Sequence, residues 1–137
     1  RTKRVLLVDD NADAVCVLSD ALRELGHEVV VASDGPRALA IAKTFRPEVA
    51  LLDIGLPGMD GYALARHLRR LQGLPANLRL VAVSGYGQEC DRRRSREAGF
   101  DAHLVKPVRL DALMEAVDRD EPSSYPVRTP EAQPIDR

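Results

Sequence analysis

The sequence predicts an α/β domain in which five parallel strands form one sheet with helices on both faces. Short runs of β-branched residues and leucine alternate along the chain with longer segments that repeat apolar residues at helical spacing. This alternation is typical of parallel strands joined by crossover helices. One run is almost continuously apolar, as expected of a strand that is buried on both faces. The chain has 137 residues, 45% of them hydrophobic, which is enough for the core of one domain.

The first half of the chain contains three of the predicted strands, separated by two helices. The first helix carries apolar residues at helical spacing between residues 14 and 25 and ends at Gly26. The second helix is expected to be capped by Ser33 and has Pro36 in its first turn. The three strands are expected at residues 4–8, 27–32 and 48–53.

The second half repeats the alternation and adds two strands. A loop rich in glycine and proline covers residues 54–61, and Asp60 within it precedes a third helix. A polar helix is expected at residues 88–98, where Gly99 ends it, and a final helix begins near Leu110. The two strands are expected at residues 78–83 and 102–105.

The composition of the chain changes after about Glu121. Four of the nine prolines lie beyond this point, in a segment with few apolar residues. We therefore expect one folded domain at residues 3–119 and a disordered tail at residues 120–137. The sequence does not begin with Met, which suggests a piece of a longer protein.

Charge and composition exclude several classes of protein. Lys and Arg total 20 and Asp and Glu total 21, so the basic excess of a general nucleic-acid binder is missing, and no direct contact with nucleic acid is expected. No apolar run approaches the ~18 residues of a membrane helix, so no membrane contact is expected. Cys16 and Cys90 lie far apart without metal-binding spacing, which predicts free thiols and a reducing, cytoplasmic location.

Polar residues collect at the predicted ends of four strands. Asp9 and Asp10 follow the first strand, Asp53 ends the third, Ser84 ends the fourth and Lys106 follows the fifth. In an open parallel sheet the carboxyl ends of the strands share one edge, where ligands bind. Each residue alone has an ordinary explanation as a turn or a helix cap. Together they predict a crevice with three carboxylates, one hydroxyl and one ammonium group.

The chemistry of this set points to phosphoryl transfer. Two carboxylates ~4 Å apart repel each other by about 4 kcal/mol at an effective dielectric constant near 20. A divalent cation with oxygen ligands, Mg²⁺ or Mn²⁺, would relieve that repulsion. Together with the ammonium group and the hydroxyl, the cation would spread the charge of a transferred phosphoryl group. A carboxylate can itself be the nucleophile.

At these residues the chain resembles the receiver domain of bacterial two-component response regulators. The resemblance covers about residues 3–119 and implies the flavodoxin-like receiver fold with strand order 2-1-3-4-5. The matching segments are VLLVDDN at residues 5–11, LLDIGLPGMDG at 51–61, VSG at 83–85 and LVKP at 104–107.

The resemblance implies a metal site and a phosphoacceptor. Asp53 would accept the phosphoryl group, and Asp10 and Asp53 would bind Mg²⁺ through their side chains. Gly55 would contribute its carbonyl, and Asp9 would bind directly or through water. A receiver catalyses only its own phosphorylation and dephosphorylation, although the parent chain can be a histidine kinase.

The resemblance also implies how the phosphoryl group is delivered and sensed. Ser84 would bond the phosphoryl oxygen, Lys106 would pair with the phosphoryl group or with Asp53, and Gly85 would leave room for the donor. The donor would be a phosphohistidine on a histidine kinase or a histidine phosphotransfer domain. A homodimer through the fourth and fifth helices is a further expectation.

One residue departs from the family pattern. Receivers usually carry Tyr or Phe three residues before the lysine, as a rotating switch, and this chain has His103 there. A pH-sensitive switch is one hypothesis, because imidazole titrates near neutrality, and a solvated surface histidine is the alternative. The arginines at 92–96 are expected to be a solvated helix face or part of a partner surface. Arg66, Arg69 and Arg70 are expected to form a plain exposed face.

The parent protein and two other functions stay open at this point. The stretches at residues 55–61 and 84–88 look like receivers of hybrid sensor kinases, so a C-terminal receiver of such a kinase is favoured over a stand-alone regulator. An aspartyl-nucleophile phosphatase would need a second acid where Gly55 stands. A flavin-binding module of this topology would need a phosphate-binding loop where Asp9 and Asp10 would repel the phosphate.

Overall fold

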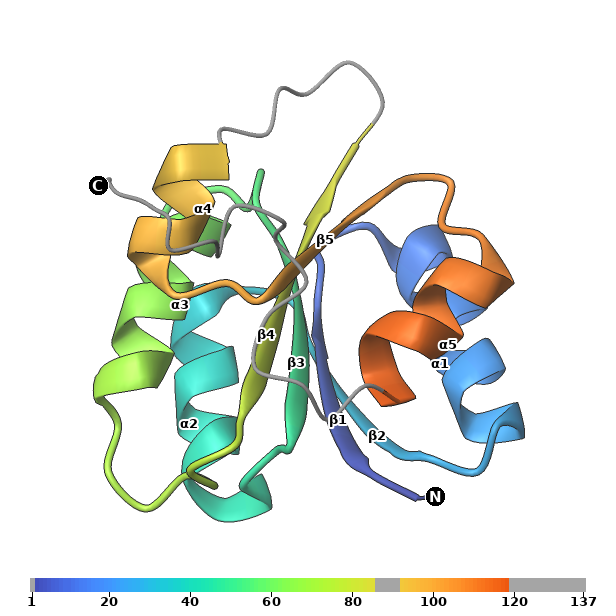
Figure 1. Cartoon of the computed structure of the whole chain (residues 1–137), viewed down its shortest axis with the longest axis horizontal. Coiled ribbons are helices and arrows are strands. Elements are labelled where there is room, and N and C mark those ends of the chain that lie inside the picture. Colours follow the sequence, from blue (N-terminus) through green and yellow to red (C-terminus); the bar gives the residue numbers. More distant parts are fainter. Residues whose placement is uncertain (1, 86–91, 119–137) are drawn as a thin grey trace, which may run out of the picture.

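A computed structural model describes residues 2–85 and 92–118, in which five strands alternate with five helices (Figure 1). All strand pairs are parallel, and the sheet has the order β2-β1-β3-β4-β5, which confirms the predicted fold. Helices α1 and α5 lie on one side of the sheet, and α2, α3 and α4 lie on the other. The elements are β1 (Arg4–Val8), α1 (Ala12–Glu24), β2 (Glu28–Ala32), α2 (Gly35–Phe45), β3 (Val49–Asp53), α3 (Gly61–Arg70), β4 (Arg79–Ser84), α4 (Arg92–Ala98), β5 (Ala102–Val105) and α5 (Leu110–Asp118).

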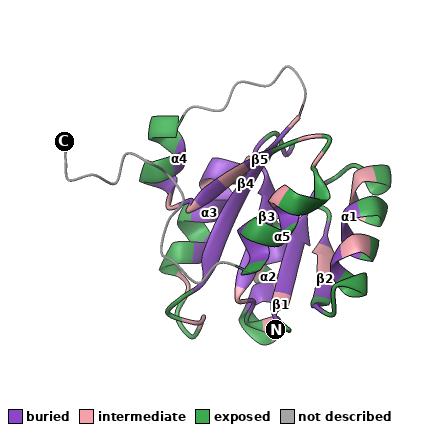
Figure 2. Cartoon of the chain, turned by 45° about the vertical axis from the view of Figure 1, so that its right-hand side comes forward, coloured by how far each residue is buried: buried purple, intermediate pink, exposed green. Residues whose placement is uncertain are grey.

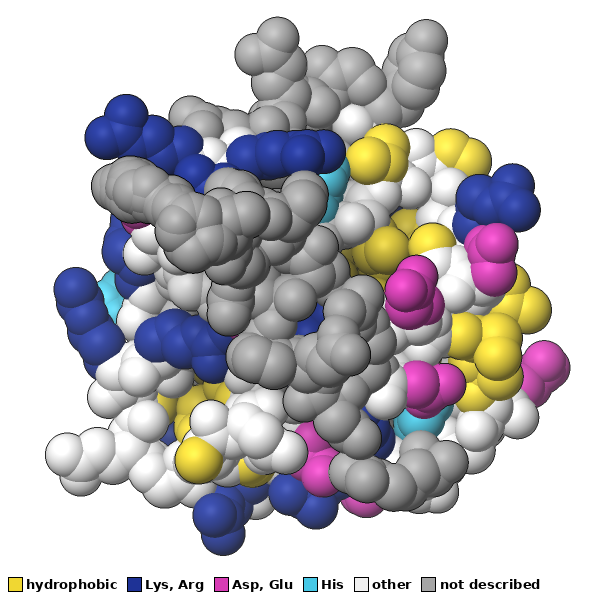
Figure 3. Space-filling view, viewed as in Figure 1, with side chains coloured by type: hydrophobic (Ala, Val, Ile, Leu, Met, Phe, Trp, Pro, Cys, Tyr) yellow, Lys and Arg dark blue, Asp and Glu magenta, His cyan; other side chains and the backbone are white. Residues whose placement is uncertain are grey.

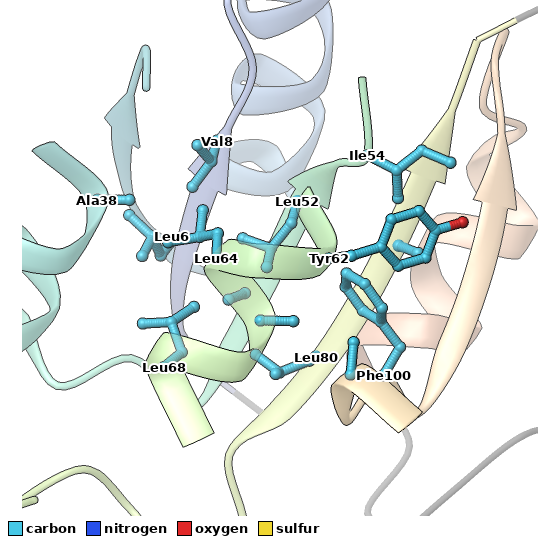
Figure 4. Packing of buried hydrophobic residues seen from close by; sticks show 14 of the residues in the cluster. Leu6, Val8, Ala38, Leu52, Ile54, Tyr62, Leu64, Leu68, Leu80 and Phe100 are labelled. Carbon is cyan, nitrogen blue, oxygen red and sulfur yellow. The ribbon is translucent and has the colours of Figure 1, made fainter. Parts of the chain in front are cut away.

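The sheet separates two apolar cores, because successive side chains of a strand point to opposite faces. Along β1, Leu6 and Val8 join the core beneath α2 and α3, whereas Val5 and Leu7 join the core beneath α1 and α5. Figure 4 shows the first core, where the rings of Tyr62 and Phe100 pack edge to face. Strands β3 and β4 are buried throughout, and the outer faces of the helices are exposed (Figure 2). This burial explains the nearly continuous apolar run of β3.

Helix caps decide where the helices begin. The side chain of Asn11 accepts hydrogen bonds at the start of α1, and Asp60, which was expected to precede the third helix, caps α3. The cap of α2 is Asp34 rather than Ser33, so that prediction was wrong. Asp34 has an extended backbone next to the helix, and its Oδ1 accepts from the Arg37 amide at 2.9 Å. Asp and Ser cap equally well, and only the path of the chain selects between neighbours.

The remaining expectations on chain organisation are met only where the structure describes them. The strand ends agree with the predicted ranges to within one residue. The predicted start of the polar helix at residues 88–91, Cys90 and the tail at 120–137 lie outside the described residues. Among the helices that the structure describes, none combines the length and apolar character of a membrane span.

Two buried cations hold the end of α5 against the sheet edge that lies opposite the acids. Lys3 Nζ donates to the Val117 carbonyl at 2.9 Å, and Arg79 Nε donates to the Ala116 carbonyl at 2.8 Å. These carbonyls belong to the last turn of the helix, where cations are favourable. Nδ1 of the buried His27 accepts from the Lys3 amide at 3.1 Å. These contacts fix the position of α5, whose other end follows the loop of Lys106.

Candidate functional site

Three carboxylates lie together at the C-terminal edge of the sheet. Asp9 and Asp10 directly follow β1, and Asp53 is the last residue of β3. Each offers one ligand oxygen, and these oxygens lie within 4.8 Å of one another. Asp9 is 3% exposed and Asp53 is 7% exposed, whereas Asp10 faces solvent. The sheet thus brings Asp53 to the other two acids although more than forty positions separate it from them in the sequence.

Lys106 reaches this acidic cluster from the loop after β5. Its Nζ lies 2.6 Å from Asp9 Oδ2 and 3.9 Å from Asp53 Oδ2. The Lys106 amide donates to the Ser84 carbonyl at 2.9 Å, which ties the loop to β4, and the peptide bond to Pro107 is cis. The ammonium group therefore compensates part of the negative charge, and its closer partner is Asp9.

The environment of Asp53 disfavours its charged form. Burial raises the pKa of Asp53 above its ordinary value, and the nearby negative charge of Asp9 adds to this effect. Two contacts act in the opposite direction: the Gly55 amide donates to Asp53 Oδ1 at 2.9 Å, and Lys106 contributes its positive charge. The Gly55 amide thus fixes the orientation of the carboxyl group. The positive charge of Lys106 does not fully offset the effect of burial on that group.

Ser84 and His103 form a hydrogen bond on the neighbouring strands. Ser84 ends β4 and is 1% exposed, and His103 lies in β5. Ser84 Oγ and His103 Nε2 are 2.8 Å apart. Burial lowers the pKa of His103, and the positive charge of Arg92 lowers it further. The expectation of a solvated surface histidine is therefore wrong, because the ring is half-buried and bonded to a buried hydroxyl.

A comparison of the amino-acid sequence with models of known families identifies the family of this chain. A sequence model of the response regulator receiver domain matches residues 5–118.

The chain belongs to the response regulator receiver family.

The similar curated proteins include receivers in different settings. The chain is 31% identical over 117 residues to the sporulation initiation phosphotransferase F of Bacillus subtilis, covering 85% of this chain and 92% of that protein. It is 34% identical over 119 residues to the virulence sensor protein BvgS of Bordetella pertussis, covering 84% of this chain and 10% of that protein. A probable transcriptional regulator ycf27 of Porphyra purpurea is 34% identical over 120 residues, which is 85% of this chain. This receiver spans about half (48%) of the length of that regulator.

Solved structures of receivers share the fold. A putative response regulator from Chloroflexus aurantiacus superposes with a TM-score of 0.79 at 29% identity, covering 88% of this chain and 98% of that one. The chemotaxis protein CheY4 of Vibrio cholerae superposes with a TM-score of 0.79 at 26% identity, covering 88% of this chain and all of that one. The family resemblance carried by the motifs is thus confirmed.

Sequence reasoning missed the part that Gly61 plays in this receiver. A Cβ atom on Gly61 would lie 2.6 Å from the Asp53 carbonyl oxygen and from Ile54 Cα. Only a residue without a side chain lets α3 start this close to the end of β3. Gly61 therefore supports the backbone that presents Asp53. The loop of residues 54–61 was recognised as rich in glycine, but this close approach has no sequence signature.

The arginines of α3 and α4 are less uniform than expected. Arg94 lies 4.2 Å from the centre of the Tyr62 ring and 3.9 Å from Asp60 Oδ2, so it links α4 to the start of α3. Arg69 is not a plain surface residue, because it donates to two carbonyls and to Asp101 Oδ2 at 2.7 Å. Basic side chains gather on the left of the molecule, on the α3–α4 side, and acidic ones mostly on the right, beside α1 and α5 (Figure 3).

Proposed function

We propose that this receiver takes a phosphoryl group from a phosphohistidine onto the side chain of Asp53. The observation that carries the proposal is the position of Asp53 itself. Its carboxylate is buried, lies beside two further acids and has an ammonium group 3.9 Å away. A carboxylate in such a site suits the role of nucleophile toward phosphorus, because cations around it would neutralise the incoming phosphoryl oxygens.

The donor set fits Mg²⁺. The ligand oxygens of Asp9, Asp10 and Asp53 lie within 4.8 Å of one another, and hard oxygen ligands are what this ion prefers. Asp10 is exposed, which would leave room for the water ligands that the ion retains. We assign the Gly55 carbonyl as a further ligand, since the turn after Asp53 is held by the Gly55 amide. When bound, the ion would offset the carboxylate repulsion and balance charge on the phosphoryl group.

The transfer itself is a displacement at phosphorus. An oxygen of the ionised Asp53 carboxylate forms the new bond to phosphorus, the bond from phosphorus to the histidine nitrogen breaks, and that nitrogen keeps the electron pair. Lys106 Nζ, near both Asp9 and Asp53, would stabilise the phosphoryl oxygens. The Ser84 hydroxyl, at the end of the strand paired with β3, would donate to one of them.

An apolar hollow beside Lys106 supports a protein donor. The hollow has a volume of about 380 Å³ and lies between α1 and the loop after β5. Val17 on its rim is 68% exposed. An apolar helix face of the phosphohistidine protein could cover Val17 and place the imidazole next to Lys106. The lining residues are Asp13, Ala14, Val17, Leu18, Lys106, Pro107 and Val108.

The context of the receiver and its self-association are further parts of the proposal. We favour the receiver part of a hybrid sensor kinase, with a stand-alone regulator as the alternative. Similarity to a sensor protein and to a phosphotransferase supports either setting. A homodimer through α4 and α5 is supported by exposed apolar side chains on β5 and α5. These side chains are Val105, Leu110 and Met114.

Acetyl phosphate tests the proposal. With Mg²⁺ present, the protein is expected to gain one labile phosphoryl group, measured as a mass increase, and chelation of the metal is expected to abolish the gain. The Asp53→Asn variant should remain unlabelled, whereas an Asp20→Asn variant on the exposed face of α1 should label normally. Continuous hydrolysis of acetyl phosphate would indicate a phosphatase instead. Label that persists in Asp53→Asn would refute the assignment.

A further inference from the structure

The contact between Ser84 and His103 is unusually well placed to sense the phosphorylation state. The two residues lie on adjacent strands, and His103 pairs in register with Ala82, two residues before Ser84. The side chain of Ala82 is only a methyl group, so the imidazole can reach past it to the serine. The resulting distance of 2.8 Å between Oγ and Nε2 is that of a strong hydrogen bond.

The Ser84 hydroxyl has one proton, which it can donate to only one acceptor at a time. A hydroxyl group has one proton to donate, and a buried hydroxyl is expected to use it. Nε2 of His103 is hydrogen-bonded to Ser84 Oγ, and it accepts the hydroxyl proton when the imidazole carries its own proton on Nδ1. We therefore infer that the resting protein holds a neutral His103 that accepts the Ser84 proton. The phosphoryl group on Asp53 would need the same proton, and both acceptors cannot have it.

We propose that phosphorylation of Asp53 reverses this hydrogen bond. The Ser84 proton turns to a phosphoryl oxygen, and His103 keeps its proton on Nδ1, takes a second proton from water at Nε2 and donates it to the Ser84 oxygen. The negative charge of the phosphoryl group favours this uptake over a shift of the single ring proton from Nδ1 to Nε2. His103 is thus a positioning residue that reports the state of Asp53 through proton uptake. The inference rests on the proposed phosphoacceptor function and adds a regulatory input to the same site.

The charges around His103 determine the direction of the coupling. From α4, Arg92 contributes a positive charge, which together with burial lowers the pKa of the resting imidazole. From β4, the ring meets the uncharged Ser84, and Lys106 follows three positions later on the same chain segment. A phosphoryl group adds negative charge and removes the proton donor, so both changes favour the protonated ring. By linkage, acidification then favours the phosphorylated state to the same extent.

The histidine at position 103 matters because a phenylalanine there could not exchange a proton with Ser84. A phenyl ring has no nitrogen to accept the Ser84 proton or to give one back. Receivers with an aromatic residue at this place, the pattern that the resemblance implies, would lack the proton coupling. The device is therefore specific to the pairing of a serine with a histidine in this chain.

The test is a pH titration of the imidazole resonances by NMR, with and without beryllofluoride and Mg²⁺ as a stable mimic of the phosphoryl group. We expect the proton affinity of His103 to rise by about tenfold or more, which is one pKa unit. The exposed His67 on α3 is the internal control and should not change. A proton affinity of His103 that stays constant or falls when beryllofluoride is bound would overturn the inference.

Two variants separate this inference from the proposed function. Ser84→Ala should show a smaller rise in proton affinity, because only the effect of the phosphoryl charge remains, and Ser84→Thr should retain the full rise because the hydroxyl is kept. If neither beryllofluoride nor acetyl phosphate modifies Asp53, the proposed function itself fails. If Asp53 is modified while the His103 titration is the same in Ser84→Ala and wild type, only the coupling is refuted.

Discussion

The ammonium group of Lys106 lies 2.6 Å from Asp9 Oδ2 but 3.9 Å from the nearer oxygen of Asp53. The lysine therefore neutralises Asp9 more directly than it neutralises Asp53. Asp53 keeps a raised pKa because its burial and the charge of Asp9 outweigh Lys106 and the Gly55 amide. Under the proposed function only the ionised Asp53 carboxylate attacks phosphorus, so the charge of Lys106 should extend the pH range in which the site reacts.

Lys106→Met should slow phosphorylation and move its pH dependence. Loss of the positive charge raises the pKa of Asp53 further, so a higher pH is needed to ionise the nucleophile. The rate with acetyl phosphate should fall by about 10²-fold, because a donor to the phosphoryl oxygens is lost. The measurement is the initial rate between pH 5 and 9, with the exposed Lys43→Met as control. An unchanged pH profile would show that Lys106 does not act on Asp53.

Asp10→Asn should weaken Mg²⁺ binding while the fold is kept. Asp10 is exposed, whereas the other two acids of the cluster are buried. We expect the affinity to fall by at least the roughly tenfold that even an outer-sphere substitution causes. The rise in the unfolding midpoint on addition of Mg²⁺ measures this affinity. The same rise in Asp10→Asn and in the control Asp20→Asn would argue against a ligand role.

Gly61→Ala should destabilise the protein and disturb the phosphorylation site. The new Cβ would lie 2.6 Å from the backbone of Asp53 and Ile54, so α3 has to move away from β3. Overpacking of this kind costs about 1–3 kcal/mol of unfolding free energy. Urea denaturation measures the loss, and acetyl phosphate labelling measures the effect on Asp53. The variant Ala63→Gly, on the same helix, controls for helix propensity, and a loss no larger than its own would contradict the steric explanation.

Arg69→Ala should destabilise the fold more than changes at its neighbours. The Arg69 guanidinium donates to the carbonyls of Leu78 and Gly99 and pairs with Asp101, so it joins α3 to the segments that lead into β4 and β5. We expect a loss of about 1–3 kcal/mol, because charge-assisted hydrogen bonds are removed. Arg70→Ala is the control, since Arg70 is exposed and forms no ion pair with a described residue. Equal unfolding free energies for the two variants would contradict the prediction.

The sequence by itself determined the architecture and the residues that meet. Apolar periodicity distinguishes strands from helices, and parallel strands all end at the same edge of the sheet. The strand order 2-1-3-4-5 came from the family resemblance, and with it the ends of β1, β3 and β5 lie close enough for Asp9, Asp53 and Lys106 to meet. The arrangement of strands in a sheet depends on whole strands and helices. An error of one residue in a predicted strand end therefore does not change which residues meet.

Only the tertiary structure decided which of the converging groups pair. Lys106 prefers Asp9, His103 bonds Ser84, and Arg69 reaches the carbonyls of another segment, and none of these follows from sequence spacing. A hydrogen bond forms or fails over less than 1 Å, and its geometry depends on packing by residues far away in the chain. The pattern of residue types carries no information at that scale. The sequence could therefore predict which groups meet at the C-terminal edge of the sheet, but not which hydrogen bonds and ion pairs they form there.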